Sequence, residues 1–507
     1  MNGTENYLLA GMYQKLFLRP LGLNSDNSLV LWLLLIYGTV ILGGLLLFNG
    51  DLPVVLVMVY FVSIALVSFL RIDYSIYTLV FLVLLFDQFG VPGFEPLTYH
   101  IDFFRNLKEV SYLPDIEGGV VNAIEIHLLF IIISLFLAMA VNKEFTWRPI
   151  PVKWPFVLFV IFSLFSLAYG MLGGGDFLAA LWEIRAFFYF FTLYLIIPQI
   201  IRSRDQLQIL IWIFIIALTF KALQGIARYI SVGFTTGLHA TLTNHEDPVF
   251  IVTLFILLFG FLVFKVRNKQ HFWLLILLLP LMLGFYFALR RAAYAAFMVS
   301  FVTFIVVLPG VIRWKFIKIM LPCLLIAGIY TAALWDSNAR FTRPIQMVKS
   351  GLERPEIDDN SEDYYSNLYR ENENYNLAQT VVNNPVTGIG FGKKYEQPVS
   401  LVDIRFPLRD YIPHNQIFWV IVKMGAVGFF SFWFFFNSFV AKGVKIFKKQ
   451  TDPYLQAVTI FIVVAVINQM VVSYFDLQLT YYRNMIYLGC LMGLLPTVEH
   501  LGKQDEG

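Results

Sequence analysis

The stretch FWLLILLLPLMLGFYFALRRAAYAAFMVSFVTFIVVLP, residues 272–309, contains two apolar runs that are separated only by Arg290 and Arg291. A transmembrane helix needs about 20 mostly apolar residues to cross roughly 30 Å of hydrocarbon, and each run is about that long. The stretch therefore predicts two membrane spans, near 272–289 and 291–309, that are joined by almost no loop.

Runs of this kind recur along the whole chain. Only 14% of the 507 residues are Asp, Glu, Lys or Arg, against roughly 25% in a typical soluble domain. This composition excludes a globular cytosolic enzyme, and the net charge of +3 provides no basic field for nucleic acid. Both cysteines lie within apolar runs, which excludes a disulfide framework. We expect an all-α polytopic membrane protein with about fourteen transmembrane helices, near 28–49, 52–70, 75–92, 122–142, 154–172, 180–201, 206–231, 248–265, 272–289, 291–309, 315–335, 414–441, 454–475 and 482–498.

The short loops predict the orientation of these spans. Every second loop carries two to four Lys and Arg residues, whereas the alternate loops 173–179, 232–247 and 476–482 carry none. By the positive-inside rule the basic loops are cytoplasmic, so both termini are cytoplasmic and segments 93–121 and 336–413 are external. We read the first apolar run as an uncleaved anchor, because it is full length and leads directly into a second span. The basic loops are 143–153, 202–206, 265–271, 310–318 and 442–453.

External segment 336–413 is too short and too polar to form a core of its own. Apolar residues at helical spacing predict an amphipathic helix that lies on the membrane surface and ends at Asn383-Asn384-Pro385. We expect the following run, 387–392, to be a flexible turn. The residues that define the apolar face are Leu368, Tyr375, Ala378 and Val382.

Arginines gather at the outer ends of the predicted spans, where positive charge is normally avoided. Arg185 lies about one turn inside the sixth span, Arg290 and Arg291 lie at the outer junction of the ninth and tenth spans, and Arg370 lies on the external helix. We interpret Arg185 and one of the adjacent pair as a clamp for a diphosphate, with snorkelling at a tight hairpin as the alternative for the pair. Arg370 binds either a ligand or a nearby surface carboxylate.

Histidines also lie at this face. His414 starts the twelfth span from outside, and a helix N-terminus disfavours imidazolium, so a neutral ring can act as a general base. The alternative is a histidine that only caps the helix at the headgroup level. We regard His239 and His245 as ordinary loop residues. No cluster of His, Cys and Asp has the spacing of a metal site, so we expect neither a metal nor another cofactor.

Three stretches of the chain resemble the bacterial O-antigen ligase and Wzy-type polysaccharide polymerase superfamily. They are Leu289–Ala296, Arg370–Gly392, and Pro413-His414-Asn415 followed by two glycines. Their order and topology agree with the family, and the resemblance spans about 180–495. In two places the chain departs from the family pattern: Arg290 replaces a serine, which makes Arg291 the matching arginine, and Tyr375 replaces a tryptophan.

The resemblance implies a GT-C-like, metal-independent, inverting glycosyltransferase of the bacterial inner membrane. Its donor would be a glycan on undecaprenyl diphosphate, and its acceptor a hydroxyl at the periplasmic face. Here His414 would be the catalytic base, and five residues would bind substrate, namely Arg185, Arg290, Arg291, Arg370 and Asn415.

Several alternatives remain open from the sequence. The acceptor is either lipid A core, a second lipid-linked glycan or a protein hydroxyl. Outside the enzymes, the competing functions are a polytopic transporter or glycan flippase, and a scaffold in an export complex. Ionisable residues at one face, without visible repeats, argue against transport. We expect N-terminal membrane helices of unassigned role over 1–142, a ligase-like membrane core over 143–498, and a cytoplasmic tail over 499–507.

Overall fold

The computed structural model describes residues 25–90, 96, 98–111, 113, 119–142, 145–231, 243–337, 339, 342–352, 361–402 and 406–505. These residues are overwhelmingly helical, and the described part of the chain contains no β-strand, only one isolated bridge between Asn106 and Asn122. The contacts divide the chain into two compact units. The first comprises residues 1–88, 96–148 and 199–213, and the second comprises 89–95, 149–198 and 214–507.

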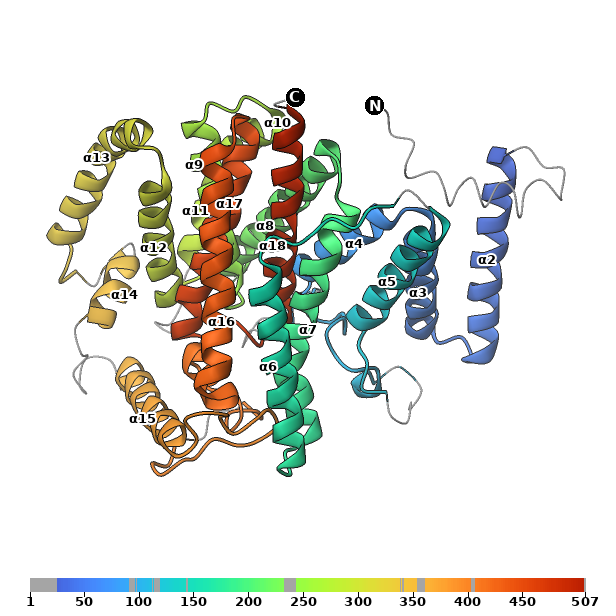
Figure 1. The fold of residues 1–507 in the computed structure, drawn as a ribbon, viewed down its shortest axis with the longest axis horizontal. Helices are drawn as coiled ribbons and strands as arrows, with labels where there is room; N and C mark the ends of the chain where they lie inside the picture. The colour runs from blue at the N-terminus through green and yellow to red at the C-terminus, as the bar shows by residue number, and fades with distance from the viewer. Residues whose placement is uncertain are drawn as a thin grey trace. The chain divides into compact units, whose positions relative to one another are not determined.

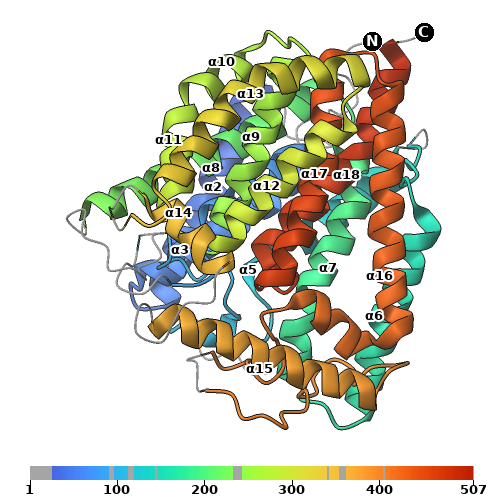
Figure 2. The same cartoon turned by 90° about the vertical axis from the view of Figure 1, so that its left-hand side faces the viewer.

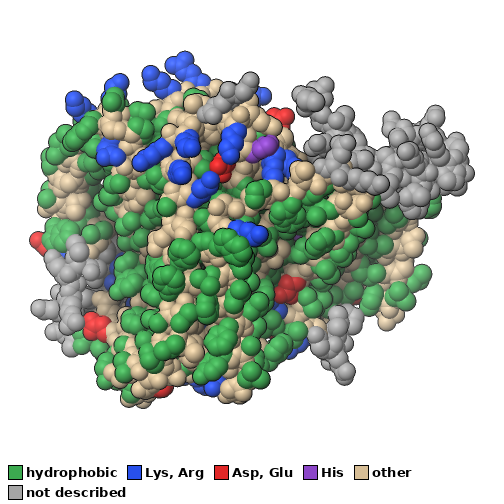
Figure 3. Space-filling view, viewed as in Figure 1, with side chains coloured by type: hydrophobic (Ala, Val, Ile, Leu, Met, Phe, Trp, Pro, Cys, Tyr) green, Lys and Arg blue, Asp and Glu red, His purple; other side chains and the backbone are tan. Residues whose placement is uncertain are grey.

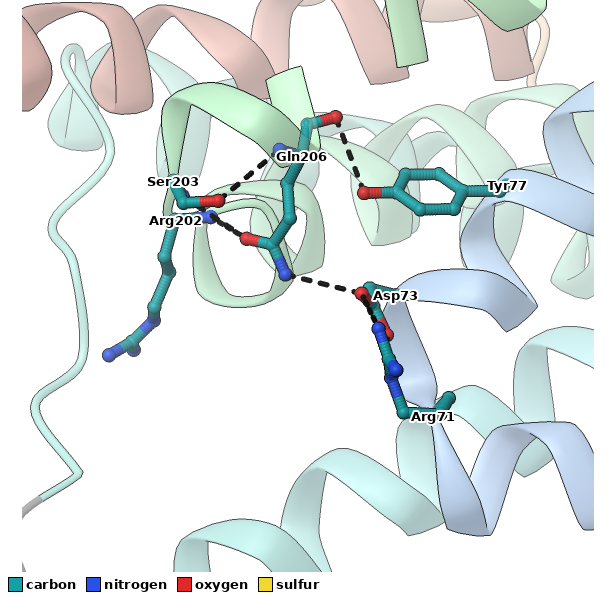
Figure 4. A network of polar contacts seen from close by, with 6 residues as sticks. All are labelled: Arg71, Asp73, Tyr77, Arg202, Ser203 and Gln206. Carbon is teal, nitrogen blue, oxygen red and sulfur yellow. Dashed lines mark hydrogen bonds and ion pairs between the residues drawn. The ribbon is translucent and has the colours of Figure 1, made fainter. Parts of the chain in front are cut away.

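The first unit contains the described helices before residue 142 and the beginning of the helix that starts at Arg204, and a network of polar contacts links two of these helices. Asp73 accepts hydrogen bonds from both Arg71 and Gln206, while the hydroxyl of Tyr77 donates to the Gln206 carbonyl (Figure 4). This network ties α4 to the beginning of α8 and contains none of the predicted site residues. The helices are α2 (Ser25–Leu47), α3 (Leu52–Leu70), α4 (Ile72–Leu85), the 3-10 helix η4 (Leu107–Glu109) and α5 (Ala123–Val141), with the first part of α8 (Arg204–Ser231).

The second unit contains the remaining helices and is centred on α17 (Pro453–Phe475) (Figure 1). This helix packs against α9, α12, α16 and α18, and its middle residues are almost completely buried. Small residues allow the close approach: a Cβ on Gly260 of α9 would lie 3.0 Å from the Ala457 side chain. The other helices are α6 (Lys153–Leu172), α7 (Phe177–Ile200), α9 (Asp247–Val263), α10 (Lys269–Ile276), α11 (Leu278–Phe287), α12 (Arg291–Val307), α13 (Gly310–Ala333), α14 (Arg343–Leu352), α15 (Ser361–Asn383), α16 (Gln416–Lys449) and α18 (Tyr482–Asp505).

The two ends of this bundle differ in charge. Helix α15 lies across the end where α6 stops and where α7 and α16 begin (Figures 1 and 2). Basic side chains gather at the opposite end, near α10, the start of α13 and the end of α16 (Figure 3). That end includes the cationic stretches 265–269, 313–318 and 442–449.

Each of the fourteen predicted spans coincides with a helix or a helix pair. Among the described residues, nine helices are long and apolar enough to cross a membrane, or ten if a bent pair counts as one span. The bent pair is α10 and α11, which meet at 51° within the predicted span 272–289. Helices α4, α9 and α12 and the stretch Trp32–Leu47 of α2 are shorter than a full span, so the number fourteen stays a prediction. Helix α18 continues to Asp505, beyond the predicted end of the last span.

The prediction of a helix that ends at Asn383 is confirmed by α15, whereas its external location stays a prediction. The predicted apolar face is turned away from the protein: Tyr375 is 51% exposed and Val382 is 70% exposed. The face that packs against the protein is largely polar and includes Glu373, Asn376 and Thr380. Leu377 on the same side packs against Ile389, Tyr395 and Val422, so α15 is held by apolar contacts while it also buries polar side chains that need partners.

Candidate active site

The segment after α15 is anchored in a break within α16. Gly425 has φ 64° and ψ −173°, which interrupts the helix, and the amides of Ile389 and Gly390 donate to the carbonyls of Val422 and Lys423. A Cβ on Gly425 would lie 2.1 Å from the Val386 carbonyl oxygen, so only glycine fits. The structure therefore corrects the prediction of a flexible turn, because residues 388–392 are buried and bonded on several sides.

A buried ion pair supports this anchor from beneath. The Lys423 ammonium lies 2.8 Å from Glu183 of α7, and both side chains are fully buried. Glu183 also accepts hydrogen bonds from the Gly392 amide (2.6 Å) and from Trp419 Nε1 (3.1 Å). One carboxylate thus joins α7, α16 and the glycine segment.

His414 is held by a carboxylate of α15. Its backbone N–H donates to Glu373 Oε2 at 2.9 Å, and its Nδ1 lies 3.2 Å from Glu373 Oε1. The ring of Tyr369 packs edge-on against the imidazole, with ring centroids 5.5 Å apart. Glu373 is buried, whereas 24% of the His414 side chain is exposed. The histidine is therefore fixed on one side and open on the other.

Asn415 begins α16. Its side-chain oxygen accepts the Phe418 N–H at 3.1 Å, as expected for an N-cap residue, and its amide group donates to Asn374 of α15. The two polar ends of this side chain are therefore engaged within the protein. The cap sets the direction in which α16 leaves His414.

A second histidine and carboxylate pair lies among the arginines. His245 Nδ1 is 2.7 Å from Asp476 Oδ2. Burial by itself would raise the pKa of Asp476, but the charges of His245, Arg290 and Arg370 outweigh burial and hold it below its usual range. Arg290 interacts electrostatically with Asp476, Tyr481 and Arg370, so the two arginines share one region. The Nε of Arg290 is buried without a hydrogen-bond partner among the described residues.

Three consecutive residues at the start of α18 extend this region. The ring of Tyr481 packs against His245, and the ring of Tyr482 lies 6.0 Å from the guanidinium of Arg185. Arg483 donates to two acidic residues that precede and begin α9, each at 2.8 Å, and all three side chains are buried. These acidic partners are Glu246 and Asp247.

Several of the polar residues at this end of the bundle belong to a stretch of sequence that matches a known family. Residues 274–433, which run from α10 to the first half of α16, match the family model described as O-Antigen ligase. This stretch of the chain is therefore similar to the O-antigen ligase family. The comparison with curated proteins gives no match.

The fold brings most of the predicted residues to one end of the bundle. Arg290 and Arg370 lie close enough to interact, and His414 contacts Glu373, one turn after Arg370 on the same helix. The guanidinium of Arg291 lies 3.3 Å from Asn367, so it also faces α15. Arg185 lies outside the matched residues and is buried against Tyr482. His239 lies outside the described residues.

Four acidic residues of this end were not identified as site residues from the sequence. Glu373 stands three residues after Arg370, so both residues lie on the same face of a helix. This spacing is the feature of the sequence that could have identified Glu373 as a site residue. The other three belong to loops or helix ends that are far from Arg370 in sequence, and no local pattern connects them. They are Glu246, Asp247 and Asp476.

No group of three or more His, Cys, Asp or Glu residues that could hold a metal ion occurs within the described ranges. The acidic residues of the site are instead paired with a basic residue or a histidine. Asp476 and Glu373 each contact a histidine, and Glu246 contacts Arg483. This arrangement suits an anionic ligand held by arginines, beside a histidine that is free to exchange a proton.

Proposed function

We propose that this protein transfers a glycan from an undecaprenyl-diphosphate donor to an acceptor hydroxyl at the periplasmic face of the bacterial inner membrane. The observation that carries the proposal is that α15 lies beside both cations and the base: Arg370 interacts electrostatically with Arg290, and Glu373, one turn further along α15, contacts His414. The match of residues 274–433 to the family model described as O-Antigen ligase supports glycan transfer in general.

The donor requires positive charge more than it requires an acid. Attack of the acceptor oxygen on the anomeric carbon breaks the bond from that carbon to the diphosphate, and the lipid diphosphate leaves with its electron pair. Arg290 and Arg370 would stabilise the developing charge, each contact being worth roughly 4 kcal/mol before desolvation at about 4 Å in a medium of effective dielectric near 20. Because the attack comes from the opposite side, the anomeric configuration inverts.

The acceptor requires orientation and a site for its proton. Nε2 of His414 would take the hydroxyl proton as the new glycosidic bond forms, while Nδ1 faces Glu373. Positioning of both substrates at the end of a rigid bundle would supply much of the remaining rate. Binding, charge stabilisation and proton removal are all assigned to side chains of the chain itself, and the proposed reaction is independent of metal ions.

Transfer by the purified protein in lipid vesicles tests this function. With an undecaprenyl-diphosphate glycan as donor, we expect equal amounts of transferred glycan and released lipid diphosphate, and no change on adding EDTA. Supplying lipid A core, a second lipid-linked glycan or a protein acceptor separately identifies the acceptor. Movement of intact donor across the vesicle membrane without release of lipid diphosphate would instead indicate a flippase.

The proposed sidedness can be tested by labelling single cysteines in a background in which Cys323 and Cys490 are replaced. A cysteine at Val382, which is exposed on α15, should react with an impermeant thiol reagent applied from the periplasmic side. A cysteine at Lys448, exposed at the opposite end of the bundle, is the control and should react only after the cytoplasmic side is opened. The reverse pattern would place the arginines in the cytoplasm and refute the proposed orientation.

A further inference from the structure

The carboxylate of Glu373 makes two contacts with a single residue. One oxygen accepts the backbone N–H of His414, and the other faces the imidazole Nδ1. The carboxylate itself is buried, with only 2% of the Glu373 side chain exposed. A buried carboxylate needs hydrogen-bond partners. Because Glu373 contacts both the backbone and the ring of the same histidine, it fixes the orientation of the imidazole as well as the position of the backbone.

This contact determines which nitrogen of His414 is available. A carboxylate accepts hydrogen bonds, so it favours the tautomer that carries its proton on Nδ1. Nε2 then has a free lone pair. Because the ring is partly exposed while Glu373 is buried, this lone pair belongs to the accessible side of the residue. A general base needs a free lone pair of this kind. Glu373 and His414 are 41 residues apart in the sequence, so the sequence alone does not reveal their contact.

We propose that Glu373 is the positioning residue of the base: it holds His414 in the Nδ1–H tautomer and stabilises the imidazolium that forms when Nε2 takes the acceptor's proton. The proton moves from the acceptor oxygen to Nε2, the Nδ1 proton stays between the imidazole and Glu373, and the carboxylate remains ionised throughout. This inference rests on the proposed function and deepens it by naming the group that makes His414 a competent base.

The position of Glu373 on α15 adds a coupling between the two halves of the reaction. Arg370 stands three residues earlier on the same helix and interacts with Arg290 and Asp476. A single rigid turn therefore carries the cation assigned to the leaving diphosphate and the carboxylate assigned to the base. Donor binding at Arg370 would fix the turn that also orients His414, so the base is aligned when the donor is present.

A purely structural role for Glu373 makes a different prediction. In that case the carboxylate would only hold residues 413–415 at the beginning of α16, and its loss would lower stability and donor affinity together. A positioning role lowers kcat and leaves donor affinity almost unchanged, because orientation of the base matters in the transition state and little in the ground state. The two roles can therefore be separated by kinetics.

The test compares Glu373→Gln and Glu373→Asp with Glu371→Gln, a matched change at an exposed position on the same helix. The glutamine oxygen can still accept the His414 backbone N–H, but its NH₂ group faces Nδ1 and favours the wrong tautomer. We expect Glu373→Gln to lower kcat by about 10²- to 10⁴-fold with donor KM within about threefold of wild type. Glu373→Asp should recover part of this loss, and Glu371→Gln should behave as wild type.

A double variant shows whether Glu373 acts through the histidine. We expect Glu373→Gln combined with His414→Ala to be no slower than His414→Ala alone, because the group that Glu373 orients is absent. An equal fold-loss on both backgrounds, or a rise in KM with kcat retained, would overturn the inference. If wild type transfers glycan and Glu373→Gln transfers it equally well, only the positioning role fails; if wild type does not transfer, the proposed function itself fails.

Discussion

Replacement of His414 by alanine should abolish glycan transfer and leave donor binding close to that of wild type. Removal of a proton by a positioned base contributes roughly 10²- to 10⁴-fold to a rate and acts mainly in the transition state. The His414 ring lies beside the carboxylate of Glu373, which repels a second anion, so the imidazole is not expected to hold the diphosphate. The measurement is donor affinity and single-turnover rate on the same purified, reconstituted protein.

Arg370→Ala is the counterpart of this variant and should show the opposite behaviour. Its side chain interacts with Arg290 and Asp476, so its loss removes charge from the proposed diphosphate site and should weaken donor binding. If His414→Ala loses donor binding as severely as Arg370→Ala, the histidine is a phosphate ligand rather than a base. If His414→Ala keeps full turnover, the assignment of the base is wrong.

Helix positions were predictable because a membrane span is a property of one continuous stretch of sequence. Each apolar run became a helix, and the external helix ended at Asn383 as its Asn-Asn-Pro sequence indicated. Hydropathy alone does not show where a helix breaks, but Pro280 within the ninth predicted span does. Proline has no N–H to donate to the carbonyl of Ile276, the last residue of α10, and α10 and α11 meet there at 51°.

The glycine segment shows the limit of local reasoning most clearly. Read alone, Gly388, Gly390 and Gly392 indicate flexibility, since each glycine has unusual conformational freedom. In the structure all three have positive φ and are buried, because they pass close to the backbones of α6, α7 and α16. The conformational freedom of these glycines lets the segment pack where a side chain would collide with neighbouring backbone. The residues that it packs against lie up to about 200 residues away in the sequence.

The arginines of the candidate site could be selected from the sequence, whereas its acidic residues could not. Arginines at a predicted outer membrane face are conspicuous against the positive-inside rule, so Arg290, Arg291 and Arg370 could be proposed individually. Acidic residues in external loops are not conspicuous in this way. Glu373 and Asp476 became site residues only when the fold placed them beside His414 and His245.

Loss of either partner from the buried pair Glu183 and Lys423 should produce the largest loss of stability of any single substitution discussed. Both side chains are fully buried, and removing one leaves an uncompensated charge in a region without water, at a cost of about 3–5 kcal/mol. Glu183 also holds the Gly392 amide and Trp419, so Glu183→Ala should release the glycine segment as well. The melting temperature of the detergent-solubilised protein measures the effect.

The matched control for Lys423→Met is Lys442→Met, which removes the partner of Glu499 in a half-exposed ion pair near the other end of α16. Solvent screens that pair, so its loss should cost no more than about 1 kcal/mol. The double change Glu183→Gln with Lys423→Met should recover part of the stability lost by Lys423→Met, because it removes the stranded charge while the amide oxygen still accepts one of the hydrogen bonds. If Lys423→Met melted at the same temperature as Lys442→Met, the buried pair would not be the anchor of the glycine segment. The position of His414 would then have to be fixed by Glu373 and the Asn415 cap alone.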